Sequence, residues 1–263
     1  MINTKLILID GIPGSGKSTT AHFIARQLEK NGIKTKWFHE ADNEHPLSVS
    51  LKEKAEGGQD PYKFRLFVSY PEKLTEFVNN VINDEYVYII EAYLFQNILN
   101  QFFKLDTDKK TIQNYYKNLI KIMGSLNPVI VYIYQKDIDK ALKNSFEDRG
   151  GSFKEFLIEL CENLLYCKNR NLSGESGIIQ MWQELQNLTF DLLNEIKFKN
   201  IIIENSDNDW DKYRKQILTF LDVKFIDEIV YEPVYKEFCG FYSGIPVYIK
   251  NDRLCIEWGW PDI

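Results

Sequence analysis

A short run near the start of the chain places glycines, a lysine and a serine at a spacing that suits phosphate binding. The run from Gly11 to Ser18 reads Gly-Ile-Pro-Gly-Ser-Gly-Lys-Ser and fits the pattern G-x-x-x-x-G-K-[ST] at every fixed position. Glycines let backbone N–H groups close around phosphate oxygens, and the lysine can reach the β- and γ-phosphates of a nucleotide. The serine hydroxyl can ligate Mg²⁺. The run therefore predicts a nucleotide-phosphate site rather than a chance glycine-rich turn.

The elements on either side of this run place it at the edge of a sheet. The apolar residues 6–9 before it predict a buried parallel strand. After it, Ala21, Ile24, Ala25 and Leu28 recur at helical spacing, and Gly32 marks the end of that helix. Strand, loop and helix together are the context that a P-loop requires. The expected phosphate-binding residues are Gly11, Pro13, Gly14, Ser15, Gly16, Lys17, Ser18 and Thr19.

Short runs rich in Ile, Val and Tyr recur along the chain and predict the strands of one sheet. They are apolar on both faces and alternate with helical patterns, as a parallel sheet covered by helices requires. We expect a three-layer α/β fold of the P-loop NTPase type, with five parallel strands in the order 2-3-1-4-5 and right-handed crossovers. The expected strands are residues 5–10, 34–38, 86–91, 129–134 and 200–204. The expected helices are residues 60–83 with a break near Pro71, 109–124, 137–147, 153–168, 178–197 and 210–222. Asp209 or Asn208 is expected to cap the last helix.

Carboxylates follow two of the predicted strands, at the edge where a doubly wound sheet binds its ligands. Glu91 ends the third strand and lies beside the P-loop if that strand neighbours the first. There it can accept a proton from a substrate hydroxyl or hold Mg²⁺, and the alternative is a solvated glutamate. Glu40 and Asp42 follow the second strand and are candidate partners of a substrate hydroxyl or of Mg²⁺-bound water. For the same loop, residues 39–46, a transition-metal site and a plain acidic turn are the alternatives.

Basic residues after the fourth strand can cover the charge that develops on a transferred phosphoryl group. Residues 136–178 are expected to form a lid, with the glycines that follow Arg149 as its hinge. Arg149 is the leading candidate for the phosphate contact and Arg170 is the second, because a planar guanidinium makes bidentate contacts. Arg65, in the helix before the third strand, either binds the acceptor or forms a surface salt bridge.

The composition is that of an ordinary soluble globular protein, with 44% hydrophobic and 27% charged residues. The net charge of −6 gives no basic footprint for nucleic acid over the whole chain. Four cysteines show no C-x-x-C spacing and are expected as free thiols in a reducing cytosol. No apolar run approaches the roughly 18–20 residues of a membrane span, and Met1 leads into the first strand without room for a signal peptide. We therefore expect a cytoplasmic protein, with a homodimer left open.

Several of these features together resemble the nucleoside and nucleotide kinase superfamily: the P-loop context, the acidic residue that ends the third strand, the arginine-bearing lid, and the closing helix. Thymidylate kinases, deoxynucleoside kinases and small antibiotic phosphotransferases belong to it, and the resemblance covers residues 1–222. It implies that Lys17 serves the phosphates, that Ser18 holds Mg²⁺ and that Glu91 is the catalytic carboxylate. Thymidylate kinases carry Asp-Arg at that point and many deoxynucleoside kinases carry Glu-Arg-Ser, whereas this chain has Glu91-Ala92-Tyr93.

The pattern changes at about residue 225, where helical spacing stops. Short aromatic and β-branched runs at 236–242, 245–250 and 253–258 are separated by two-residue links that signal hairpins. They predict a small antiparallel β meander, which alone is barely stable and is expected to pack on the main domain or on a partner. The expected domains are residues 1–224, which are P-loop kinase-like, and residues 225–263, which form the meander.

The resemblance implies an enzyme that uses ATP and Mg²⁺ to transfer a phosphoryl group to a small molecule. Lys17 and the P-loop amides would hold the donor phosphates, and Arg149 would close over the γ-phosphate. The acceptor is a nucleoside, a nucleotide or an antibiotic-like hydroxyl compound, and the sequence leaves that choice open. The alternative is a nucleotide-dependent switch or regulatory NTPase that acts through a partner. Such a switch requires a water-positioning glutamine after the third strand, where Gln96 lies five residues past Glu91.

Overall fold

The computed structural model describes residues 2–42, 45–49 and 60–227, and the backbone of three short strands at 240–242, 245–250 and 253–256. The chain divides into two compact units, residues 1–225 and 226–263. The first unit contains the parallel sheet and all of the candidate site residues, and each unit is described by itself.

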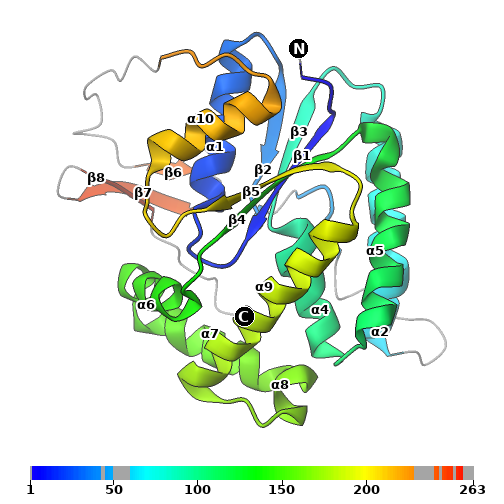
Figure 1. The fold of residues 1–263 in the computed structure, drawn as a ribbon, viewed down its shortest axis with the longest axis vertical. Coiled ribbons are helices and arrows are strands. Elements are labelled where there is room, and N and C mark those ends of the chain that lie inside the picture. The colour runs from blue at the N-terminus through cyan, green and yellow to red at the C-terminus, as the bar shows by residue number, and fades with distance from the viewer. Residues whose placement is uncertain are drawn as a thin grey trace. The chain divides into compact units, whose positions relative to one another are not determined.

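A parallel sheet forms the centre of the first unit (Figure 1). Its strands are β1 (Leu6–Gly11), β2 (Thr35–Phe38), β3 (Val87–Glu91), β4 (Val129–Tyr134) and β5 (Lys199–Glu204). They are arranged in the order β2-β3-β1-β4-β5, which confirms the predicted strand order. Ile9 of β1 lies opposite Glu91 of β3 on one side and opposite Val131 of β4 on the other. The carboxyl end of β3 therefore lies next to the P-loop, which follows β1.

Helices separate the strands along the chain. They are α1 (Lys17–Lys30), α2 (Pro61–Phe64), α3 (Tyr70–Val81), α4 (Ile98–Lys104), α5 (Lys109–Met123), α6 (Ile138–Arg149), α7 (Gly151–Asn163), α8 (Leu165–Asn169), α9 (Gly174–Glu195) and α10 (Trp210–Leu221). Two π-helical turns, η1 (Arg65–Ser69) and η2 (Tyr93–Asn97), lead into α3 and α4.

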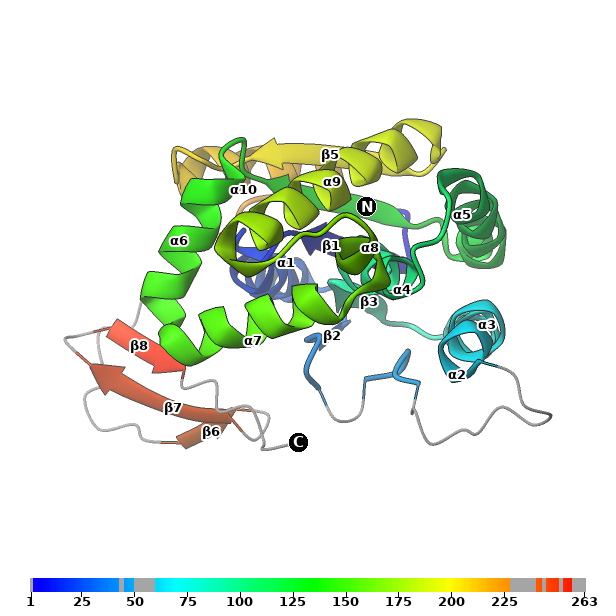
Figure 2. The same cartoon turned by 90° about the horizontal axis from the view of Figure 1, so that it is seen from below.

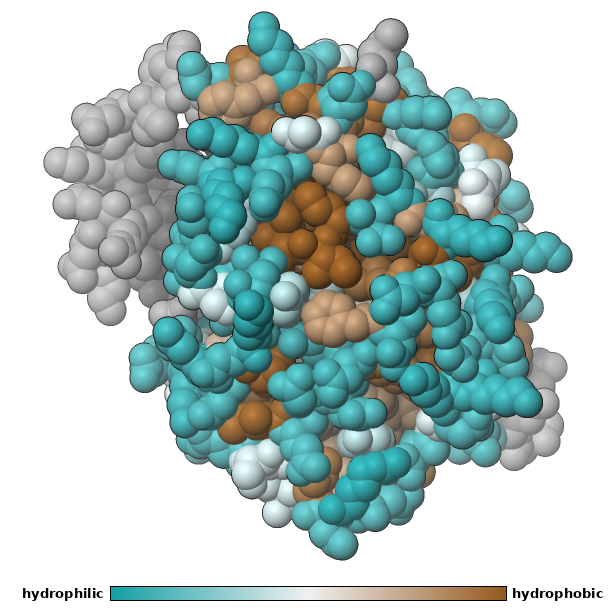
Figure 3. Space-filling view, in the orientation of Figure 1, coloured by the Kyte–Doolittle hydropathy of each residue, from teal (hydrophilic) through white to brown (hydrophobic). Residues whose placement is uncertain are grey.

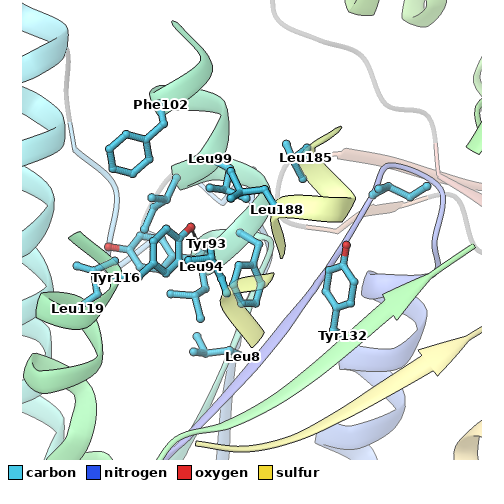
Figure 4. Packing of buried hydrophobic residues seen from close by; sticks show 14 of the residues in the cluster. Leu8, Tyr93, Leu94, Leu99, Phe102, Tyr116, Leu119, Tyr132, Leu185 and Leu188 are labelled. Carbon is cyan, nitrogen blue, oxygen red and sulfur yellow. Dashed lines mark hydrogen bonds between the residues drawn. The ribbon is translucent and has the colours of Figure 1, made fainter. Parts of the chain in front are cut away.

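Alternate side chains of the strands face two hydrophobic layers, as the period of a strand requires. On one face, Ile7 and Ile9 of β1 pack with residues of α1 and α10. On the other face, Leu6 and Leu8 belong to a larger cluster with residues of α3, α4, α5 and α9. Figures 1 and 2 show the two groups of helices on opposite sides of the sheet, and Figure 4 shows part of the larger cluster around Leu8. The expected three-layer fold is therefore confirmed.

The helix predicted over residues 60–83 is interrupted near Pro71, where the π-helical turn η1 leads into α3 and the proline has no N–H to donate to the preceding turn. A second helical segment differs from the prediction. The segment from η2 to α4 is not among the expected helices. Its residues Leu94, Phe95, Leu99 and Phe102 are all fully buried. Gln96, Asn97, Asn100 and Gln101 are only partly buried and recur at helical spacing on the opposite side, so the segment is amphipathic and its helical pattern is present in the sequence.

β5 departs from the expectation of strands that are covered on both faces. It lies at one edge of the sheet, with β2 at the other, and its Ile202 is 40% exposed. Ile202 and Phe220 of α10 line a depression of about 450 Å³. Figure 3 shows a hydrophobic patch near the middle of the face on which β5 lies in Figure 1.

The second unit contains three antiparallel strands paired in the order β6-β7-β8. They are β6 (Gly240–Tyr242), β7 (Ile245–Lys250) and β8 (Arg253–Ile256). They lie within the runs that the sequence predicts as strands. The expected packing of the meander on the main domain involves residues outside the described ones and stays a prediction. Across the described parts of both units, no helix has the length and hydrophobicity needed to cross a membrane.

Candidate active site

The P-loop holds its glycines in backbone conformations that other residues rarely adopt. Gly14 and Gly16 have φ angles of 77° and 90°, and a Cβ on Gly16 would lie 2.2 Å from the ring of Trp210. A Cβ on Gly11 would lie 2.2 Å from the carbonyl oxygen of Ile133, so the close approach of β4 also requires glycine. These contacts fix the loop between β4 and α10.

The amino end of α1 presents hydrogen-bond donors to a ligand. The residue that precedes the helix, Gly16, provides no side-chain cap, and the first N–H groups of a helix have no acceptor within it. Ser15 is 1% exposed, and its hydroxyl has no hydrogen-bond partner in the part of the chain that is described. Such donors bind phosphate oxygens together with the positive end of the helix dipole. Pro13 belongs to the same loop, and Thr19 to the first turn of α1.

Lys17 is buried and connects the P-loop to the segment after β3. Its ammonium donates to the carbonyl oxygen of Ile12 at 3.1 Å and to Oε1 of Gln96 at 2.8 Å. Nε2 of Gln96 donates in turn to Oε2 of Glu40 at 2.8 Å. The side chain of Gln96 therefore bridges the P-loop and the turn after β2, a role that its position in the sequence does not indicate.

Glu91 is buried at the end of β3, so it is not a solvated glutamate. Its Oε2 accepts a hydrogen bond from Oγ of Ser18 at 2.8 Å, and its Oε1 accepts one from Nε1 of Trp37 at 2.5 Å. Burial raises the pKa of Glu91 to about 7, although the hydrogen bond from Ser18 and the charge of Lys17 oppose that change. A hydroxyl and a carboxylate this close form a hard oxygen donor set, which fits Mg²⁺.

A second buried carboxylate, Asp10, was not singled out by sequence reasoning. It is the last residue but one of β1 and accepts hydrogen bonds from the backbone N–H groups of Gly11 at 3.0 Å, Phe95 at 2.7 Å and Gln96 at 3.0 Å. Burial raises its pKa to about 6, which these hydrogen bonds and Lys17 oppose. Asp10 therefore fixes the η2 segment against the P-loop and positions Gln96. The only sequence signal for it is an acidic residue immediately before the first glycine of the motif.

Glu40 and Asp42, the two candidate carboxylates of the turn after β2, both lie near the site. Oδ2 of Asp42 accepts the backbone N–H of His39 at 2.8 Å, so this side chain also shapes the turn. Among the described residues, no three His, Cys, Asp or Glu side chains are grouped as a metal site requires. The transition-metal alternative for residues 39–46 also involves Asn43 and Glu44, which lie outside the described residues.

A cavity of about 260 Å³ opens beside this turn. Its walls come from the turn after β2, from η1 and the start of α3, and from η2 and α4. It is lined by Glu40, Asp42, His45, Leu47, Ser48, Val49, Arg65, Tyr70, Tyr93, Asn97, Ile98 and Gln101. The guanidinium of Arg65 lies 5.3 Å from the centre of the Tyr70 ring. This placement favours the acceptor-binding alternative for Arg65.

Arg149, the leading lid candidate, lies near the P-loop side of the site. It is the last residue of α6. Ser145 of the same helix lies next to the P-loop, since a Cβ atom added to Gly14 would be 3.1 Å from the Cβ of Ser145. The guanidinium lies 4.7 Å from the centre of the Phe153 ring. The pKa of His39 is lowered chiefly by burial, and the charge of Arg149 adds to that change.

Arg170, the second lid candidate, is engaged elsewhere. It follows α8, pairs with Asp106 at 2.6 Å, and lies 3.8 Å from the centre of the Tyr166 ring. Neither partner belongs to the P-loop or lines the cavity. The structure therefore does not bring Arg170 together with the other candidate residues.

The loop after β5 supports the P-loop with side chains. Nδ2 of Asn205 donates to the carbonyl oxygen of Ser15 at 2.6 Å, and Trp210 lies against Gly16. The predicted cap of α10 is confirmed, because the side chain of Asp209 accepts the backbone N–H of Lys212. Asn205 and Trp210 were missed, because no spacing rule identifies a residue that supports a loop 190 positions away.

The P-loop, the buried carboxylate beside it and the strand order define a P-loop kinase. A thymidylate kinase of Brachyspira hyodysenteriae is 30% identical over 148 residues, which cover 56% of this chain and 70% of that relative. The chain therefore belongs to the thymidylate kinase family, and its activity is nucleotide-dependent phosphoryl transfer to a small molecule. No family model matches the chain.

Solved thymidylate kinases resemble the chain at low identity. One from Ehrlichia chaffeensis superposes with a TM-score of 0.48 at 14% identity, over 82% of this chain and 97% of that one. Another from Candida albicans superposes with a TM-score of 0.47 at 15% identity, over 84% of this chain and 92% of that one. The family assignment rests on the Brachyspira relative.

Proposed function

We propose that the chain uses ATP and Mg²⁺ and transfers the γ-phosphoryl group to a small molecule held in the cavity beside Glu40. The observation that carries this proposal is the pair of hydrogen bonds from Lys17 to Gln96 and from Gln96 to Glu40, each 2.8 Å long. They join the loop suited to nucleotide phosphates with the wall of the cavity. Two substrates bound at these places would meet near Lys17.

The proposed roles follow from the contacts. The N–H groups of the P-loop and the ammonium of Lys17 bind the β- and γ-phosphates. Ser18 and Glu91 would hold Mg²⁺, the carboxylate directly or through water, and the ion would neutralise charge on the transferred group. Arg149 is proposed to approach the γ-phosphate from a lid of residues 136–178. The catalytic part is proposed to be residues 1–224, with residues 225–263 as an appended meander.

The test is the dependence of ADP release on an acceptor. Purified full-length protein with ATP and Mg²⁺ should release ADP slowly alone and faster with the right compound from a panel of nucleosides, nucleotides and aminoglycoside- or phenicol-type compounds. Lys17→Ala should abolish the stimulated rate, and Lys121→Ala on the exposed side of α5 should not. ADP release that is equally fast with and without every compound would instead favour a switch or regulatory NTPase, with Gln96 positioning the attacking water.

A further inference from the structure

Two of the four cysteines are in contact at the corner between α7 and α8, two helices that Figure 1 shows next to each other. Cys161 lies in the last turn of α7, and Cys167 lies in α8. Their Sγ atoms are 3.0 Å apart, and both thiols are free. Both residues are fully buried. Their spacing is not the C-x-x-C of common redox motifs, so it is the fold that brings the two sulfur atoms together.

The backbone between the two helices makes this contact possible. Along one continuous helix of 3.6 residues per turn, side chains six positions apart point to nearly opposite sides. Leu164 interrupts the helix, with φ and ψ angles of −73° and 134°, and α8 begins at the next residue. The N–H of Leu164 donates to the carbonyl oxygen of Cys161 at 3.0 Å. The extended residue therefore turns the chain so that both thiols enter the same buried corner.

Each helix of the corner is held by a different neighbour. At the end of α7, Oε1 of Glu162 accepts a hydrogen bond from the N–H of Gly174, the first residue of α9, at 3.0 Å. In α8, the ring of Tyr166 stacks on Phe103 of α4 with 4.4 Å between the ring centres. Because α7 is fixed to α9 and α8 is fixed to α4, the sulfur atoms are held against each other.

The contact also favours reaction of one thiol. With Cys167 as the donor, the hydrogen bond between the thiols lowers the pKa of Cys161, which burial opposes, and raises the pKa of Cys167. The thiolate is the nucleophilic form of a cysteine. A nucleophilic sulfur with a second thiol in contact is the arrangement that forms a disulfide after oxidation. Since both thiols are buried, a small oxidant is required.

We propose that Cys161 and Cys167 are a redox-active pair, which a hydroperoxide oxidises to an intramolecular disulfide that restrains the corner between α7 and α8. The bond closes the short loop of residues 161–167 and joins two helices that are held by different neighbours. The corner lies within residues 136–178, the proposed lid, but the inference does not depend on the proposed function.

The oxidation balances with one molecule of hydrogen peroxide. The sulfur of the Cys161 thiolate attacks one peroxide oxygen, the O–O bond breaks, and the hydroxide that leaves takes up a proton to give water. The sulfur of Cys167 then attacks the sulfur of the resulting sulfenic acid, whose S–O bond breaks, and a second water leaves. The two thiols lose two electrons and two protons, and the peroxide is reduced to two molecules of water.

The first experiment maps the bond on the folded full-length protein. The protein is reduced, separated from the reductant and treated with hydrogen peroxide, and the remaining thiols are alkylated in urea. Trypsin, which cuts after lysine and arginine, releases both cysteines in one peptide, residues 155–168. We expect this peptide to lose both alkylation sites and two hydrogen atoms of mass. After further cleavage behind Glu162, its two cysteine fragments should stay joined until dithiothreitol is added.

Single variants identify the cysteines that react. Cys161→Ser removes one member of the pair, and Cys239→Ser is the matched control that removes a cysteine and keeps the pair. After peroxide, Cys161→Ser should show no bond in this peptide, and Cys239→Ser should show the same bond as the wild type. A treated wild-type peptide with two alkylated cysteines, or with sulfinic acid and no bond, would overturn the inference. A disulfide from Cys161 or Cys167 to Cys239 or Cys255 would do the same.

The second experiment measures whether the bond restrains the corner. The N–H groups of Leu164 and Leu172 donate to the carbonyl oxygens of Cys161 and Cys167, so their hydrogen exchange reports opening of this region. Exchange at these amides should slow by about tenfold in the oxidised wild type and recover after dithiothreitol. Peroxide-treated Cys161→Ser should keep the rate of the untreated variant. Unchanged or faster exchange in wild-type protein that carries the bond would overturn the proposed restraint.

Discussion

The candidate site has a donor half and an acceptor half that are constructed in different ways. The donor half is the P-loop, residues 11–19, one continuous segment whose glycines are fixed by β4 and by α10. The acceptor half is the cavity, whose walls come from residues within the segments 40–42, 45–49, 65–70 and 93–101. The donor half depends on backbone conformation, whereas the acceptor half depends on how side chains from distant segments pack together.

This difference indicates how each half responds to change. A substitution in the donor half acts on phosphate contacts that every reaction of the protein needs. A substitution in the acceptor half alters one wall of a cavity and leaves the P-loop in place. We therefore expect donor-half effects to be large and the same for all acceptors, and acceptor-half effects to be smaller and to depend on the acceptor.

The largest effect is expected for Lys17→Ala. Turnover should fall by a factor on the order of 10²–10³ with every acceptor, because one charge-stabilising contact to the reacting phosphates is lost. Steady-state ADP release is the measurement, with Lys121→Ala as the matched control and thermal unfolding as the test of folding. A folded Lys17→Ala protein with undiminished turnover would show that Lys17 and the P-loop do not bind the reacting phosphates.

Glu91→Gln should lower turnover by a factor on the order of 10², with little change in ATP affinity. The amide keeps the shape of the side chain but cannot accept both hydrogen bonds, from Ser18 and from Trp37, and it cannot take a proton. Turnover at saturating ATP and calorimetric ATP binding are measured together. Glu85→Gln, on the exposed side, is the control. Weaker ATP binding with unchanged turnover would assign Glu91 to the donor half alone.

Gln96→Ala tests the connection between the halves. The substitution removes the hydrogen bonds to Lys17 and to Glu40, so we expect KM for the acceptor to rise about tenfold and KM for ATP to rise less. Gln183→Ala, which removes a surface hydrogen bond to Asn187 on α9, is the control. A rise in KM for ATP with no rise in KM for the acceptor would show that Gln96 serves the donor half only.

The same contrast explains how much of the molecule the sequence predicts. The P-loop, the strand order and the place of Glu91 follow from local patterns and from the geometry of parallel sheets. The η2–α4 segment was missed, although its buried apolar residues alternate at helical spacing with the partly exposed Gln96, Asn97, Asn100 and Gln101, so that its helical pattern is present in the sequence. The contacts of Trp37, Gln96 and Asn205 join segments far apart in the chain, and only the packed structure brings them together.

The smallest effect expected concerns the pH dependence of stability, in which the two halves act in opposite directions. Asp10, beside the donor half, has its pKa raised by burial from 3.8 to about 6. The native state therefore holds more protons than the unfolded state between about pH 4 and pH 6, and this group's contribution to stability falls as the pH rises through that range. His45, in the acceptor half, has its pKa lowered by burial from 6.5 to about 4. For this group the unfolded state holds more protons than the native state, so the contribution of His45 to stability rises with pH over much the same range.

Because the two contributions oppose each other, the wild-type free energy of unfolding should change little between pH 4.5 and pH 6.5 on account of these groups. Relative to the wild type, His45→Asn should make stability fall more steeply with rising pH, by at most about 2–3 kcal/mol over the range for a shift of roughly two pKa units. Asp10→Asn should change the slope in the opposite direction, while Glu91, whose pKa burial also raises, makes the same contribution in the wild type and in both variants. Urea unfolding at several pH values measures both slopes, and His22→Asn on α1 is the control for loss of a histidine. If both variants gave the wild-type slope, burial would not shift the pKa values of Asp10 and His45 in opposite directions.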